Sequence, residues 1–172
     1  MTDKKENILK AALELFANEG YNAVSTNAIA KKAGVSEGLI FRHFENKKAL
    51  LDSIMQMAEQ KINIVFAPIL FETDPLNVIH HSISLPFQIE ESEYDFWRLQ
   101  FKLKWQSEYY NVDKMKPVID KFIWAFTMLG YQNPALEATF LEQIIETISI
   151  GILRNGKESQ LNYQQFLINK YQ

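Results

Sequence analysis

Cysteine is absent from the 172-residue chain, and histidine occurs three times, as His43, His80 and His81. The absence of cysteine excludes disulfides, zinc–thiolate sites, thiol-based redox sensing and a thiol nucleophile. So few histidines leave little material for a histidine-based metal site. The adjacent His80 and His81 point in different directions on a helix, so we expect no metal and no cofactor.

Long hydrophobic runs are missing as well. No uninterrupted stretch approaches the ~18 apolar residues that a transmembrane helix requires. The amino terminus is polar and charged and carries no signal-peptide core. Apolar residues make up 47% of the chain and charged residues 23%, which is typical of folded globular domains. The sequence therefore predicts a cytoplasmic protein with no membrane partner.

Glycine and proline are scarce too, with six and five residues, and strand-like alternation is rare. Apolar residues recur instead at spacings of three and four, the helical period. This pattern predicts an all-α fold of about nine helices. Capping and stop residues place them as follows: a first helix ended by Gly20, a second opened by Thr26 and ended by Gly34, a third opened by Ser36, a fourth running from Asn46 to Pro68, a fifth from Asp74 to near Pro86, and four more over about 92–110, 113–130, 133–154 and 159–171.

Charge is unevenly distributed along the chain. The formal net charge is −3, yet residues 1–50 hold eight basic and six acidic side chains, and residues 51–172 hold ten and fifteen. A small positive excess at the amino end is a weak indication of an anionic partner, and it needs a motif beside it.

Residues 26–47 supply that motif. A short helix, a Gly34-Val35 turn and a second short helix from Ser36 form a helix-turn-helix. Ala30 is small enough for the two helices to cross closely. Such a unit holds one helix at the surface so that its first turn can enter the DNA major groove.

Several spaced segments of the amino-terminal region form a pattern: Ile8–Phe16, Gly20-Tyr21, Ile29–Gly38, Phe41–Phe44 and Lys47–Leu51. Over about residues 8–51 these segments resemble the DNA-binding domain of TetR-type repressors. The resemblance implies a homodimeric, ligand-responsive transcriptional repressor that binds a near-palindromic DNA operator. It divides the chain into a helix-turn-helix domain over 1–48 and a helical effector-binding and dimerisation domain over 49–172.

The resemblance places Thr26, Ser36 and Lys47 against DNA phosphates. Hydroxyls at helix N-termini and a lysine charge suit that role physically. Taken as isolated residues, Thr26 and Ser36 are explained equally well as ordinary helix caps, and Lys47 as a solvated lysine.

The remaining candidate DNA contacts lie in the recognition helix. Gly38 lets that helix sit close to the groove, while Arg42 and His43 can reach phosphates or a base edge. Glu37 can accept a hydrogen bond from a cytosine amino group, and Leu39 can pack on a thymine methyl group. We assign Ile40 and Phe44, by contrast, to internal packing.

One candidate departs from the family pattern. The family usually carries tyrosine at the position of Phe41, and its hydroxyl commonly meets a phosphate. Phe41 keeps the aromatic ring and lacks the donor. Glu37 also makes the recognition surface less basic, so both residues predict a modest affinity for DNA.

Aromatic residues are concentrated between Pro68 and Gly130. Trp97, Phe101 and Trp105 are four apart and share a helical face. The family resemblance implies that the fourth to seventh helices enclose an effector pocket. With Trp124 and a polar anchor at His80, these residues are candidates to line it, and an aromatic lining suits a small, largely apolar or aromatic effector. The alternative for each is ordinary core packing.

The last two expected helices carry wide apolar stripes that one thin subunit cannot bury alone. In the resembling family these helices pair with their symmetry mates. The candidate interface residues are Leu141, Ile144, Ile145, Ile148, Ile152 and Phe166.

Two other kinds of function compete with a ligand-responsive regulator. No phosphate-binding glycine loop, H-E-x-x-H or G-x-S-x-G pattern is present, so the sequence does not favour an enzyme. A helical DNA-binding regulator whose pocket is filled by its own aromatic side chains, answering to a protein partner or to nothing, remains the alternative.

Overall fold

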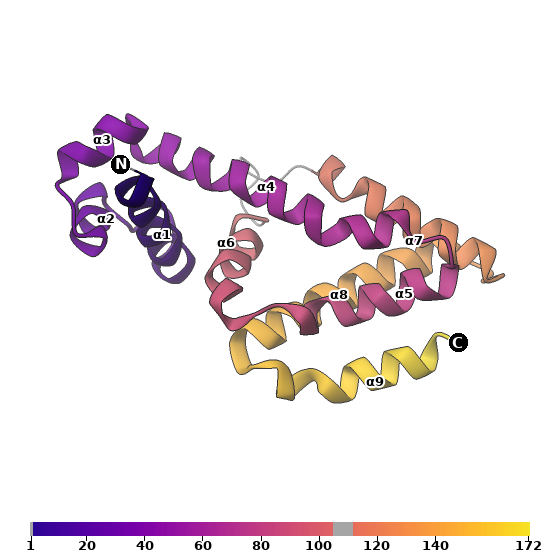
Figure 1. Cartoon of the computed structure of the whole chain (residues 1–172). Coiled ribbons are helices and arrows are strands. Elements are labelled where there is room, and N and C mark those ends of the chain that lie inside the picture. The colour runs from indigo at the N-terminus through magenta and orange to yellow at the C-terminus, as the bar shows by residue number, and fades with distance from the viewer. Residues whose placement is uncertain (1, 105–111) are drawn as a thin grey trace. The chain divides into compact units, whose positions relative to one another are not determined.

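The computed structural model describes residues 2–104 and 112–172. Within these residues the chain forms nine α-helices and four short 3-10 turns and contains no strand, so the predicted all-α fold is confirmed (Figure 1). None of the described helices combines the length and the apolar character needed to cross a membrane. The helices are α1 (Thr2–Glu19), α2 (Thr26–Ala33), α3 (Glu37–Phe44), α4 (Lys47–Phe71), α5 (Pro75–Ser84), α6 (Tyr94–Lys104), α7 (Lys116–Met128), α8 (Pro134–Asn155) and α9 (Leu161–Lys170).

The chain divides into two compact units. Of the described residues, the first unit comprises 2–62 and 92–104, and the second comprises 63–91 and 112–172. Helix α6 therefore belongs to the same unit as α1–α3, although it lies well inside the sequence region assigned to effector binding. The functional boundary at residues 48 and 49 stays a prediction.

A single apolar cluster holds the first unit together. Each fully buried large aliphatic or aromatic side chain contributes about 1.5–3 kcal/mol relative to exposure. Helix α6 supplies two members, so its inner face is part of this core. The largest buried members are Ile8 and Phe16 of α1, Ile29 of α2, Ile40 and Phe44 of α3, Leu50, Leu51 and Ile54 of α4, and Leu99 and Leu103 of α6.

The turn between α2 and α3 is closed by Gly34, at φ +67° in the left-handed region. The N–H of Val35 donates to the carbonyl of Ala30, and the N–H of Gly34 donates to that of Lys31. These two bonds form a Schellman motif, which satisfies carbonyls that a helix end leaves unpaired. The predicted end of the second helix is confirmed.

The start of α2 differs from the prediction. Ser25, rather than Thr26, is the N-cap: its Oγ accepts a hydrogen bond from the N–H of Ala28 at 3.1 Å. Two adjacent hydroxyl residues offer the same chemistry. Ser25 is in extended backbone, as a cap requires, whereas Thr26 is already the first helical residue.

Helix α4 begins as predicted and ends later. Asn46 Oδ1 accepts from the N–H of Ala49 at 2.8 Å, which confirms the expected cap. The helix passes through Pro68 and ends at Phe71. A proline removes one backbone hydrogen bond, and burial of Ile69 just beyond it stabilises the continued turn.

The second unit is built around the pairs α7 with α8, α5 with α7, and α5 with α9. Asp74 caps α5 by accepting from the N–H of Asn77 at 2.9 Å, with Pro75 in the first helical position, as predicted. Pro134 likewise opens α8 directly after Asn133. The predicted starts of both helices are confirmed, although the Asn133 side chain makes no capping hydrogen bond.

Candidate nucleic-acid interface

Helix α3 presents two different faces. Ile40 and Phe44 are buried in the core of the first unit, which confirms their assignment to packing. Gly38, Phe41 and Arg42 are exposed, and Phe41 keeps 45% of its surface open to solvent. The buried face fixes the helix on the domain, and the exposed face is available to a partner.

Two of the residues expected to contact DNA are less accessible to solvent. Leu39 is half-buried and packs against the core of the unit, so only part of its side chain can meet a thymine methyl group. His43 is half-buried as well, with its ring 6.1 Å from the ring of Phe44. The DNA contacts predicted for both residues stay predictions.

Gly38 and Ser36 lie at the start of α3 with open surroundings. A Cβ built on Gly38 would meet no atom within 4 Å, so packing within the described residues does not require glycine there. Ser36 occupies the N-cap position, yet its side chain makes no capping hydrogen bond and the residue is exposed. Both features suit close approach of a partner to the first turn of α3.

Lys47 is held inside the domain. Its Nζ donates to the carbonyl oxygens of Tyr21 at 2.9 Å and Val24 at 2.8 Å, and it lies 4.4 Å from the centre of the Tyr21 ring. The ammonium thus ties the first turn of α4 to the loop between α1 and α2. Two of its three donors are engaged before any phosphate arrives.

Thr26 is also engaged. Its Oγ1 donates to Oε1 of Glu37 at 2.5 Å, across the α2–α3 turn. Both residues are candidate DNA contacts, and the structure brings them together.

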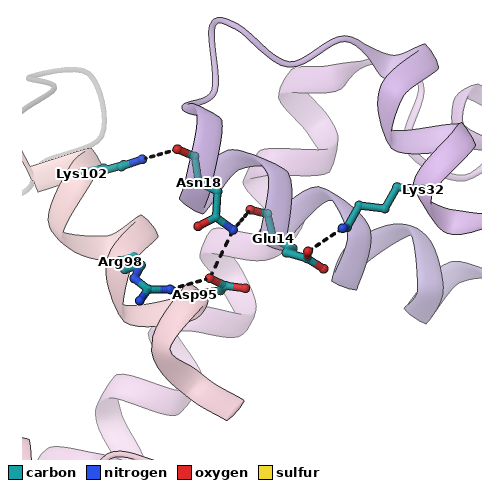
Figure 2. Close-up of polar contacts among 6 residues, drawn as sticks. All are labelled: Glu14, Asn18, Lys32, Asp95, Arg98 and Lys102. Atoms are coloured by element: carbon teal, nitrogen blue, oxygen red, sulfur yellow. Dashed lines mark hydrogen bonds and ion pairs between the residues drawn. The ribbon is translucent and has the colours of Figure 1, made fainter. Parts of the chain in front are cut away.

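The polar rim of the first unit joins α6 to α1 and α1 to α2 (Figure 2). Asp95 Oδ1 accepts from Asn18 Nδ2 at 3.4 Å and from Arg98 at 3.1 Å, and Lys102 Nζ donates to the Asn18 carbonyl at 3.0 Å. Exposed pairs of this kind contribute little. The buried Leu99 and Leu103 therefore hold α6 against the domain.

The same rim includes an ion pair between α1 and α2. Lys32 Nζ lies 2.5 Å from Glu14 Oε1, so part of the positive charge at the end of α2 is neutralised within the protein (Figure 2).

The effector candidates fall in both units. Trp97 and Phe101 lie one turn apart on α6, Trp124 is half-buried on α7, and Trp105 lies outside the described residues. Lys121 Nζ sits 4.1 Å from the centre of the Trp124 ring. The indole Nε1 of Trp97 is buried and has no hydrogen-bond partner in the described structure. Their role in effector binding stays a prediction.

His80, expected to anchor an effector, is occupied elsewhere. Its Nε2 lies 2.6 Å from the backbone carbonyl oxygen of Tyr171, so it ties α5 to the end of the chain. Tyr171 itself is fully buried, and its hydroxyl donates to Glu137 Oε2 at 3.3 Å. Burial, followed by the nearby Glu137 carboxylate, raises the pKa of Tyr171 above its ordinary value of 10.

The dimer candidates need correction. Leu141, Ile148 and Ile152 are buried in the core of their own unit and have no surface to offer a second subunit. Ile144 and Ile145 are half-buried, and Phe166 is 63% exposed, so their assignment to the interface stays a prediction.

Other residues carry the exposed apolar surface of α8 and α9. They include Leu136 and Phe140 of α8, and Leu161 and Tyr163 of α9. The first three belong to the apolar stripes predicted for an interface, although they are not among its selected candidates, and Tyr163 was not predicted. The spacing of apolar residues along the helix was the sequence signal that could have separated the buried face from the exposed one. Leu141, Ile148 and Ile152 follow one another at spacings of seven and four and share a face, which Phe140 does not join.

Comparison with known proteins supports the helix-turn-helix directly. Residues 8–54 match the family model described as bacterial regulatory proteins, tetR family. YvkB, an uncharacterized HTH-type transcriptional regulator of Bacillus subtilis strain 168, is 44% identical over 55 residues. That match covers 32% of this chain and 29% of YvkB, well under two thirds of the relative's length.

Solved structures extend the likeness of fold along the chain. A putative transcriptional regulator from Saccharomonospora viridis, in complex with choline, matches with a TM-score of 0.73 and 19% identity over 99% of this chain and 96% of its own. The regulator FadR from Bacillus subtilis, in complex with stearoyl-CoA, matches with a TM-score of 0.69 and 18% identity over 95% of each chain. At such identities these likenesses concern the fold. The matching family model and the helix-turn-helix geometry show that residues 8–54 are similar to the DNA-binding region of bacterial regulatory proteins of the tetR family.

Proposed function

We propose that the chain is a DNA-binding transcriptional regulator that binds a near-palindromic operator as a homodimer and is released by a small effector. The observation that carries the proposal is α3, whose inner residues Ile40 and Phe44 are buried while Gly38, Phe41 and Arg42 face outward. A helix held in this way can enter the major groove. TetR-family regulators are non-enzymatic, so the protein acts by binding.

Exposed apolar residues on α8 and α9 support the homodimer. Phe140 is 48% exposed and Phe166 is 63% exposed, with Leu136 and Leu161 also open to solvent. Large aromatic side chains on a surface are typical of interface anchors. A two-fold dimer would place two copies of α3 about one DNA turn apart, or a multiple of it, which accounts for a near-palindromic operator.

Trp97 favours a particular kind of effector. A buried indole N–H without an acceptor costs free energy, and a bound molecule can supply the acceptor. An apolar or aromatic effector that carries one hydrogen-bond acceptor would satisfy it. Two proteins of like fold were solved with small molecules, choline and stearoyl-CoA, which supports an effector in general and no particular one.

Helices α4 and α6 are the proposed route from effector to DNA. Helix α4 continues from residues of the first unit into residues of the second, and α6 carries Trp97 while packing on α1. An effector that shifts either helix would change the position of α3 for binding DNA. By linkage, effector and operator then weaken each other's binding by the same factor, typically worth ~1–3 kcal/mol.

The alternative keeps the DNA-binding role and removes the effector. Phe122 and Phe126 are buried, and the Phe126 ring packs 5.4 Å from the ring of Tyr171, so aromatic side chains fill part of the second unit themselves. A regulator of this kind would answer to a protein partner or act constitutively.

The first experiment is binding of the purified protein to DNA flanking its own gene, titrated with salt. A protected near-palindrome, with affinity that falls steeply as salt rises, supports the proposal, because each neutralised phosphate releases counterions. Absence of any protected site in that DNA and in a genome-wide fragment pool would refute it. Thermal-shift screening with apolar compounds that carry an acceptor then separates an open pocket from a filled one.

A further inference from the structure

A hydrogen bond joins the starts of the two helices of the helix-turn-helix. Thr26 is the first residue of α2 and Glu37 the first residue of α3. The Thr26 hydroxyl donates to Glu37 Oε1 at 2.5 Å. The bond therefore restrains the half-buried Glu37 side chain.

This bond conflicts with a phosphate contact by Thr26. A hydroxyl has one proton to donate, and phosphate oxygens accept hydrogen bonds without donating any. Thr26 therefore cannot donate to Glu37 and to a phosphate at the same time. A phosphate brought to Thr26 would also approach the Glu37 carboxylate, and two negative charges at that distance repel each other.

The bond leaves Glu37 able to read a base. Only Oε1 is held by Thr26, so Oε2 keeps its capacity to accept a hydrogen bond. Glu37 directly precedes Gly38, where an added Cβ would meet no atom within 4 Å. A DNA groove can therefore come close at this turn. Among the base edges in the major groove, the cytosine amino group is the donor that a carboxylate typically accepts from.

We propose that Glu37 selects cytosine at one position of each operator half-site and that Thr26 is a positioning residue that orients the Glu37 carboxylate. The inference rests on the proposed function, in which α3 enters the major groove. It changes the role of Thr26 from phosphate ligand to support for base recognition.

The test compares four variants with the wild-type protein: Thr26→Val, Thr26→Ser, Glu37→Gln and the double variant Thr26→Val with Glu37→Gln. Valine keeps the shape of threonine without the hydroxyl, and serine keeps the hydroxyl. Each full-length protein is bound to the operator and to every single-base variant of one half-site, at several salt concentrations. Thermal melting confirms that each variant is folded.

The wild-type protein should prefer cytosine at one position by about tenfold or more. Glu37→Gln should lose that preference and favour adenine there, because an amide pairs with the adenine edge. Thr26→Val should weaken discrimination at the same position while leaving the salt dependence unchanged, and Thr26→Ser should retain it. The double variant should discriminate among bases at that position at least as well as Glu37→Gln alone.

Two results would overturn the inference. If Thr26→Val weakens binding equally for all sequences and lowers the salt slope by about one per subunit, Thr26 is a phosphate ligand. If Glu37→Gln tightens binding without changing the order of base preference, the carboxylate merely repels DNA. In both cases the wild-type protein still binds its operator, whereas failure of the proposed function would appear as no operator binding at all.

Discussion

At the scale of single residues, the candidate DNA interface contains two kinds of side chain: those hydrogen-bonded within the protein and those exposed to solvent. Lys47 and Thr26 are hydrogen-bonded inside the domain, whereas Ser36 and Arg42 are exposed and Gly38 has open space around it. Loss of DNA binding on mutation therefore means different things at these positions. At a residue that is hydrogen-bonded within the domain, loss of DNA binding can result from destabilisation of the domain itself.

Gly38→Ala should separate folding from DNA binding. The added methyl group meets nothing in the described structure, and alanine in place of a helical glycine should stabilise the domain by about 0.5–1 kcal/mol. If α3 approaches the groove closely here, operator affinity should fall by about tenfold, equivalent to ~1.4 kcal/mol. Thermal melting and DNA titration on one preparation measure both effects. Unchanged affinity would contradict a close approach at Gly38.

Lys47→Met should destabilise the first unit. It leaves the carbonyl groups of Tyr21 and Val24 without their charged donor, which should cost about 1–3 kcal/mol in urea unfolding. The exposed Lys31, changed to methionine, is the matched control and should stay within ~0.5 kcal/mol of the wild type. Equal stability of the two variants would show that the Lys47 hydrogen bonds contribute nothing to folding.

At the scale of elements, α6 is joined to α1 by apolar packing, with polar pairs at its rim. Leu99 and Leu103 are buried in the same core as the residues of α1–α4, whereas Lys102 is exposed. The family resemblance assigns α6 to the effector region, and the spacing of its aromatic residues makes them candidate pocket residues. The face of α6 that carries Leu99 and Leu103 determines which unit this helix packs with.

Leu99→Ala should therefore destabilise the first unit by about 2–5 kcal/mol, since it removes a buried side chain and leaves a cavity. Lys102→Ala removes only an exposed contact to Asn18 and should change stability by less than ~0.5 kcal/mol. Chemical denaturation followed by circular dichroism measures both. Comparable losses in the two variants would argue that the polar rim, rather than the core, fastens α6.

The end of α9 should make stability sensitive to alkaline pH. The pKa of the buried Tyr171 is raised above 10, so between pH 10 and its higher folded-state pKa only the unfolded chain ionises at this residue. Its contribution to stability is complete below pH 10 and is lost as pH rises through that range.

Tyr171→Phe should reduce the alkaline loss of stability by at most one proton's worth of pH dependence per chain. The exposed Tyr163, changed to phenylalanine, is the control and should leave the dependence as it is in the wild type. Urea unfolding at several values between pH 9 and 11 measures the slope. An identical slope in wild type and Tyr171→Phe would contradict the raised pKa.

At the scale of the whole molecule, the proposed dimer depends on the outward side chains of α8 and α9. Phe140→Asp should raise the dimer dissociation constant by at least about 30-fold, because it replaces a candidate anchor with a charge. Met128→Asp places the same charge on an exposed apolar residue of α7 and should leave the dimer intact. Analytical ultracentrifugation distinguishes the two. A Phe140→Asp protein as dimeric as Met128→Asp would exclude Phe140 from the interface.

Local features of the sequence were sufficient for much of the fold. The caps at Asn46 and Asp74, the stop at Gly34 and the proline start of α8 depend on neighbouring residues alone. The helix-turn-helix followed from the same signals together with the family resemblance. Local ambiguity explains the misplaced cap at Thr26, since Ser25 offers the same hydroxyl one residue earlier.

The sequence by itself thus predicted the helices, the helix-turn-helix motif and the family that its amino-terminal region resembles. Only the tertiary structure decided which partners Thr26, Lys47 and His80 have within the protein, and which face of α8 is exposed. The physical reason is that helical periodicity and capping act over a few residues. A side chain's partner, and whether an apolar stripe is covered, depend on segments far away in the chain, as the bond between His80 and Tyr171 illustrates.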